Sequence, residues 1–124
     1  ADKISVPVRI GDHMLLDAMP TVIKIDVEGY EPRVINGLTD TIRRAHPLII
    51  TEVVAQHLIR CGSSVGALLE GMTELGYAGF RCSSHRNGKD FRLTRITEVD
   101  PEDCDIAWLH ADSEVYARLC SLIT

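Results

Sequence analysis

The chain has 124 residues, of which 45% are hydrophobic and 25% charged, and its formal net charge is −5. This length suits one domain with a buried core, and the composition is that of a folded globular protein rather than a disordered one. The negative charge and scattered basic residues disfavour nucleic acid as a partner, and no apolar run approaches the ~20 residues that span a bilayer.

The first element that the pattern predicts is an extended strand over residues 4–10. Ile4, Val6, Val8 and Ile10 alternate with polar residues or proline, which is typical of a strand with one buried face. Pro7 either places such a strand at a sheet edge or weakens it. We expect Asp12 to cap a short helical turn that follows.

A strand–helix–strand unit comes next. Residues 22–27 are β-branched and almost continuously apolar, as expected for a strand covered on both faces. A helix is predicted from Pro32 to His46, and Pro47 ends it. Residues 48–53 repeat the buried-strand pattern, so the connection predicts two parallel strands with a right-handed crossover.

The second half of the chain predicts a helix over residues 64–75, followed by antiparallel strands. Residues 77–82 and 91–96 flank a polar stretch with Asn87-Gly88, a strong hairpin signal. Residues 105–110 read as a last strand, and a helix capped by Ser113 follows. We therefore expect residues 1–124 to form a single α/β domain with parallel strands and an antiparallel carboxyl-terminal edge.

The cysteine pattern predicts free thiols. Cys61, Cys82, Cys104 and Cys120 form no C-x-x-C pair, and no histidine lies at zinc-finger spacing from two of them. The start of the chain also lacks the order of a secretory signal. Together these features favour a reducing compartment, and the cytoplasm is the expected location.

Acidic residues gather where two predicted strands end. Asp26, Glu28 and Glu31 follow one strand, and Glu52 lies near the end of the next. Ligands bind at the carboxyl ends of parallel strands, and neighbouring strands lie about 5 Å apart. We therefore expect Asp26 and Glu52 to line one cleft, where carboxylates can bind a hydroxyl or a cation or act as a general base.

Three charged residues in and after the first of these strands also have a purely structural interpretation. Glu31 can serve as a helix cap, Glu28 as an exposed or ion-paired side chain, and Lys24 as a long side chain that reaches from the sheet face to water. Asp26 is the strongest functional candidate, because it interrupts an apolar strand and a buried lone carboxylate is costly.

The same stretch resembles the FkbM family of methyltransferases. The residues that carry the resemblance are the run IKIDVEGYE within 23–31, Val34-Ile35-Asn36-Gly37, and the strand from Pro47 to Glu52. Residues 8–12 and Leu75-Gly76-Tyr77 resemble the flanking motifs of that family. The similarity covers Ile4 to about Cys82.

The resemblance implies part of a Rossmann-like methyltransferase sheet and methyl transfer from S-adenosyl-L-methionine to a hydroxyl oxygen of a small molecule, such as a sugar or a polyketide. It implies that Asp26 faces the methyl-transfer site and the cofactor. Glu28 and Glu52 then border the acceptor pocket, which gives three candidate catalytic residues. No metal is expected; a divalent ion held by Asp26 and Glu52 is the alternative.

The chain departs from the family in one respect. The glycine-rich turn that binds the nucleotide after the first strand, written roughly D-x-G-A-x-x-G, and the acidic residue that holds the ribose do not occur. The resemblance therefore implies the carboxyl-terminal part of a methyltransferase, which on its own is expected not to bind the cofactor. The strand over residues 22–26 is then an open edge that can pair with another chain or a second copy.

Two other functions are compatible with parts of the pattern. A methyltransferase-like domain without catalysis could use its open edge for interaction or dimerisation. A hydrolase could combine Asp26 or Glu52 with His13, His57 or His110, but the chain has no nucleophile motif such as G-x-S-x-G.

Overall fold

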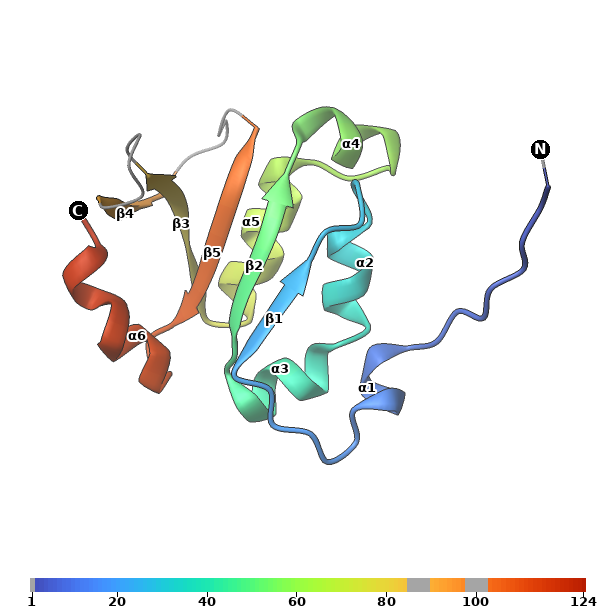
Figure 1. Ribbon diagram of the computed structural model, residues 1–124, viewed down its shortest axis with the longest axis horizontal. Helices are drawn as coiled ribbons and strands as arrows, with labels where there is room; N and C mark the ends of the chain where they lie inside the picture. The colour runs from blue at the N-terminus through green and yellow to red at the C-terminus, as the bar shows by residue number, and fades with distance from the viewer. Residues whose placement is uncertain (1, 85–89, 98–102) are drawn as a thin grey trace.

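A mixed five-stranded sheet is the framework of the protein in the computed structural model, which describes residues 2–84, 90–97 and 103–124 (Figure 1). Its strands are β1 (Val22–Ile25), β2 (Leu48–Val53), β3 (Tyr77–Ser84), β4 (Phe91–Arg95) and β5 (Cys104–His110). The helices are α1 (Gly11–Met14), α2 (Glu31–Asn36), α3 (Thr39–Ala45), α4 (Ala55–Arg60), α5 (Val65–Glu74), α6 (Glu114–Leu119) and the short 3-10 helix η1 (Cys120–Leu122).

The strand order is β1-β2-β5-β3-β4. β1 and β2 are parallel, with Ile25 beside Thr51, whereas β5 is antiparallel to both β2 and β3, and β4 is antiparallel to β3. The expected α/β class, with a parallel pair and an antiparallel carboxyl-terminal part, is confirmed. One feature was not predicted: the last strand inserts between β2 and β3.

Each face of the sheet has its own core. Strand residues of one face, such as Ile25, Ile49 and Trp108, pack with apolar side chains of α2 to α5. Residues of the other face, such as Ala107 and Leu109, pack with α6 and η1. The alternation of side chains along each strand produces this division.

The predicted helix over residues 32–46 is two helices. α2 ends at Asn36, and α3 begins at Thr39. The hydroxyl of Thr39 donates a hydrogen bond to the carbonyl of Asn36 at 2.9 Å, which satisfies a carbonyl at the end of α2. α4 was not predicted, because its six residues are too few to show a helical period. The helix predicted over residues 64–75 is confirmed as α5, and of the two candidate caps, Ser63 and Ser64, it is Ser64 that accepts the N–H of Ala67.

The predicted strand over residues 4–10 is wrong. This segment is extended, but it pairs with no strand of the described chain, and the exposed fractions of Ile4 and Val8 are both 86%. Figure 1 shows it leading away from the sheet beyond α1 and α2. An alternating pattern specifies a strand only where a neighbouring strand and a core exist to receive it.

The predicted local cap at Asp12 is also wrong. Asp12 lies inside α1, and its carboxylate instead accepts hydrogen bonds from the backbone N–H groups of Asp40 at 3.0 Å and Thr41 at 2.9 Å, and from the Thr41 hydroxyl at 2.7 Å. These groups belong to the first turn of α3. Asp12 therefore caps a helix 28 residues further along the chain, which ties the amino-terminal segment to α3.

The edges of the sheet agree with the expectations where the structure describes them. β1 is the outermost strand on one side of the described sheet, and β4, which pairs with β3, is the outermost on the other. The predicted Asn87-Gly88 turn lies outside the described residues. No helix in the described part of the chain is both long and apolar enough to cross a membrane.

Candidate functional site

The carboxyl ends of β1 and β2 bring two of the predicted residues together. Asp26 follows directly after β1, and Glu52 lies in the last part of β2. Because Ile25 pairs with Thr51, the next residues, Asp26 and Glu52, are neighbours across the parallel pair. Their proximity was predicted from the strand pattern and is confirmed.

The proximity of the two carboxylates affects the ionisation of Glu52. The negative charge of Asp26 is the main cause that raises the pKa of the Glu52 carboxyl, followed by partial loss of water and by a side-chain hydrogen bond with Asp26. Asp105 raises this pKa further, and His57 lowers it. Glu52 is therefore a stronger base than an isolated glutamate.

The burial argument for Asp26 does not hold. Asp26, Glu28 and Glu52 are all exposed, so the cost of burying a lone carboxylate cannot explain why Asp26 interrupts the strand. β1 ends at Ile25, and Asp26 already stands in the turn. What distinguishes Asp26 is the repulsion between its charge and that of Glu52.

Glu28 occupies a different environment. Its backbone has a φ of 52°, which is in the left-handed region that non-glycine residues rarely adopt. Its carbonyl accepts a hydrogen bond from Arg60 Nη2 at 3.4 Å and from Cys61 Sγ at 3.8 Å. Its carboxylate is not among the charges that perturb Glu52. The structure thus fixes the backbone of Glu28 but does not bring its side chain into the Asp26–Glu52 pair.

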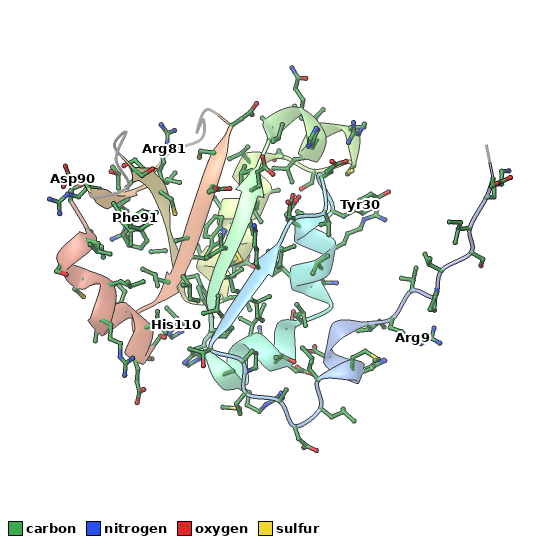
Figure 2. All side chains as sticks on the ribbon, viewed as in Figure 1. Arg9, Tyr30, Arg81, Asp90, Phe91 and His110 are labelled. Carbon is green, nitrogen blue, oxygen red and sulfur yellow. The ribbon has the colours of Figure 1, made fainter. Side chains whose placement is uncertain are left out.

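Glu31 holds the turn that follows Asp26. Its side chain is only 2% exposed, and it accepts backbone N–H hydrogen bonds from Val27 at 3.2 Å and Gly29 at 2.9 Å. The residue at the N-cap of α2 is Tyr30, which Figure 2 shows beside this turn. Glu31 is therefore a clamp on the turn rather than a conventional helix cap.

Two further residues act on Glu52, of which His57 was named from the sequence only within the hydrolase alternative and Asp105 was not named as a site residue at all. Asp105 lies directly opposite Glu52, because β5 is inserted beside β2, and His57 comes from the unpredicted helix α4. A spacing argument cannot find them, since neither the place of β5 in the sheet nor the existence of α4 is visible in the pattern.

The structure also bears on other chemistry at this edge. In residues 2–84, 90–97 and 103–124, no group of three or more histidine, cysteine or acidic side chains is arranged to hold a metal ion. A cavity of about 250 Å³ lies between α2, α3 and α5, and neither Asp26 nor Glu52 lines it. The Asp26–Glu52 pair instead faces open solvent.

The residues present fit one end of S-adenosylmethionine. The paired carboxylates suit the positive charge of a sulfonium. The turn after β1 cannot offer the N–H groups of Val27 and Gly29 to a ligand, because Glu31 already occupies both. The sequence contains no D-x-G-A-x-x-G turn, so only the charge of the carboxylate pair is complementary to the cofactor, at its sulfonium.

The strand order, with an antiparallel strand inserted beside a parallel pair that carries acidic residues at its carboxyl ends, defines a partial Rossmann-like methyltransferase fold. The family model described as "Methyltransferase FkbM domain" matches residues 1–78. The chain belongs to this family, as its motifs suggested. No curated protein and no solved structure matches it.

Proposed function

We propose that this domain forms the acceptor side of an S-adenosylmethionine-dependent methyltransferase that acts on a hydroxyl oxygen of a small molecule, of the sugar or polyketide type. The observation that carries the proposal is the pairing of Asp26 and Glu52 at the carboxyl ends of β1 and β2. Membership of the FkbM family supports methyl transfer as the reaction class.

The chemistry requires a hydroxyl group that is oriented and then loses its proton. The cofactor, when bound, supplies a methyl group on a positively charged sulfur. Glu52, whose pKa is raised by the charge of Asp26, accepts the hydrogen bond of the reacting hydroxyl and takes its proton, while the oxygen would gain the methyl group and the cofactor would leave as a neutral thioether. Asp26 accepts a hydrogen bond from a second hydroxyl of the acceptor and so aligns it. The exposed carboxylate of Glu28 borders the acceptor.

We test these roles by replacing Glu52 and Asp26 in the protein expressed from its natural reading frame. Methyl transfer is measured with labelled cofactor and a panel of sugar and polyketide alcohols. Glu52→Gln should lower kcat about 10²- to 10⁴-fold, because general acid–base catalysis contributes about that much. Glu70→Gln, on the exposed side of α5, is the matched control. Unchanged turnover in Glu52→Gln would remove Glu52 from the mechanism.

The proposal also assigns nucleoside binding to a different part of the enzyme. The nucleoside-binding part is supplied by a segment outside these 124 residues or by another chain, which the missing glycine-rich turn supports. Isothermal titration of the 124-residue chain with S-adenosylmethionine should show no binding, and micromolar binding would overturn this division.

A second function, self-association through the open edge, is favoured by a specific observation. β1 is the outermost strand, and the exposed apolar side chains of Val22, Ile4 and Val8 lie on β1 and the amino-terminal segment. Exposed edges and unpaired alternating segments can pair with each other. Sedimentation at several concentrations should then show a homodimer that Val8→Asp weakens, whereas a monomer at all concentrations contradicts it.

A further inference from the structure

The turn between β1 and α2 is built around a buried carboxylate. Glu31 is nearly inaccessible, yet its two oxygens each accept one backbone N–H: Oε1 from Val27 and Oε2 from Gly29. A buried carboxylate is tolerated only when such charge-assisted hydrogen bonds replace its lost water. The backbone conformation of residues 27–29 is therefore specified by Glu31.

Each of the two donors directly follows a residue proposed to act on or border the acceptor. Val27 follows Asp26 directly, and Gly29 follows Glu28. The consecutive positive φ angles of 52° at Glu28 and 108° at Gly29 turn the backbone, and both amides meet the same carboxylate. The Val27 amide that Glu31 holds belongs to the peptide unit that joins Asp26 to Val27.

The opposite side of the same turn rests on α4, which follows Glu52 in the chain. A Cβ atom on Gly29 would collide with the backbone carbonyl of His57, so the two backbones are in close contact. The side chain of Arg60 reaches the carbonyl of Glu28. The turn after β1 and the helix after β2 are therefore locked together, with Glu31 beneath the turn.

We propose that Glu31 is a positioning residue that sets the placement of Asp26 against Glu52 by clamping the backbone of residues 27–29. Its catalytic meaning rests on the proposed function, but the placement itself does not. Glu31 does not touch the acceptor, since both of its oxygens are engaged and its side chain is buried.

A residue that only stabilised the fold would leave the Asp26–Glu52 pair unchanged in the folded protein. The pKa of Glu52 therefore distinguishes a positioning role of Glu31 from a purely stabilising one, because Asp26 is the neighbour that perturbs this pKa most. The other groups that act on Glu52 are Asp105 of β5 and His57 of α4, and neither is bonded to Glu31 in the structure. A change in the pKa of Glu52 on altering Glu31 would therefore report movement of the turn.

The experiment is a carboxyl-carbon NMR titration of Glu52. In Glu31→Gln, one acceptor oxygen becomes an NH₂ donor, so one of the two N–H groups loses its partner. We expect the pKa of Glu52 to fall toward its ordinary value and to lie between that of the native protein and that of Asp26→Asn. Glu31→Asp keeps the charge but is one methylene shorter, and should give a smaller fall. Glu70→Gln is the control and should match the native protein.

A Glu52 pKa in folded Glu31→Gln that equals the native value would overturn the proposal. If the Gln variant does not fold, Glu31→Asp decides in the same way. The native protein gives an independent measurement: the amides of Val27 and Gly29 should exchange slowly although they lie outside any helix or strand, and exchange at the rate of free amides would contradict the clamp. None of these readouts uses methyl transfer, so a failure of the proposed function would be seen separately.

Discussion

The two ends of the parallel strands β1 and β2 are built in opposite ways. At their carboxyl ends, Asp26 and Glu52 are exposed and repel each other on a tightly held turn. At the other end, the rings of His110 and His46 are stacked, with 3.8 Å between their centroids. The ring of Tyr77 packs nearly perpendicular to that of His110. Figure 2 labels Tyr30 near the first end and His110 near the second.

The polar groups of the two ends differ in their exposure to water. The His110 end is closed by packing: the Tyr77 hydroxyl donates a buried hydrogen bond of 2.8 Å to the carbonyl of Pro47. The Asp26 end is open, and only its backbone is anchored. An exposed charged pair on a fixed backbone is the arrangement that the proposed function requires, and the buried hydrogen bond at the other end is expected to contribute to stability.

The largest change in stability is expected when the contact between the turn after β1 and α4 is disrupted. Gly29→Ala should lower the free energy of unfolding by about 3 kcal/mol or more, because the new Cβ meets backbone atoms of His57 at an already unfavourable positive φ. Gly62 also has a positive φ, of 81°, but a Cβ added there would meet no atom within 4 Å. Gly62→Ala should therefore cost only about 1–2 kcal/mol. Denaturant unfolding followed by circular dichroism measures both, and equal losses would mean that the turn is not locked against α4.

Sequence patterns predicted the carboxylates of the open end better than their setting. The strands 22–27 and 48–53 were readable from their β-branched, almost continuously apolar residues, and their parallel pairing placed Asp26 beside Glu52. The expectation that the first of them is covered on both faces was wrong, because β1 lies at the sheet edge and Val22 and Lys24 are exposed. The clamp by Glu31 was not readable, since it depends on left-handed backbone at Glu28, a conformation that its residue type does not indicate.

The closed end was almost invisible in the sequence. His46 and His110 lie far apart along the chain, and they meet only because β5 inserts beside β2. Asp12 failed as a local cap for the same reason: its partners in α3 are set by tertiary packing. Local patterns specify elements, whereas the contacts between distant elements depend on strand order.

A smaller loss of stability is expected when the buried hydrogen bond of the closed end is removed. Tyr77→Phe should lower the free energy of unfolding by about 1–2 kcal/mol, because the buried carbonyl of Pro47 loses its donor. Burial raises the pKa of the Tyr77 hydroxyl, so it remains a donor throughout the usual pH range. Tyr30→Phe removes a hydroxyl from a ring that is 49% exposed and should change stability by less than about 0.5 kcal/mol. A cost at Tyr30 as large as that at Tyr77 would remove the contrast between the two ends.

The smallest expected effect is the opposite response of the two ends to acid. Burial, and then the nearby His46, lower the pKa of His110 from 6.5, so the closed end loses stability as pH falls from 6.5 through the folded-state pKa. The charge of Asp26 raises the pKa of Glu52 from 4.5, so the open end gains stability as pH falls through that raised pKa toward 4.5. Burial raises the pKa of Asp12, but the hydrogen bonds from the first turn of α3 and the charge of Arg44 together outweigh it and keep this pKa below 3.8, so the contribution of Asp12 is lost only in stronger acid.

Because the two ends oppose each other between pH 6.5 and 4.5, the native profile alone hides both contributions. The comparison of variants separates them. Relative to the native protein, Glu52→Gln should be stabilised near pH 7, and this advantage should shrink as pH falls toward 4.5. His110→Gln should show no loss that begins near pH 6.5. Asp26→Asn should resemble Glu52→Gln, since it removes the charge that raises the Glu52 pKa. Unfolding by urea at half-unit pH steps measures all three variants.

The decisive quantity is the difference in the free energy of unfolding between Glu52→Gln and the native protein. If this difference is constant with pH, the two carboxylates do not interact, and the basis for pairing Asp26 and Glu52 at one site is removed.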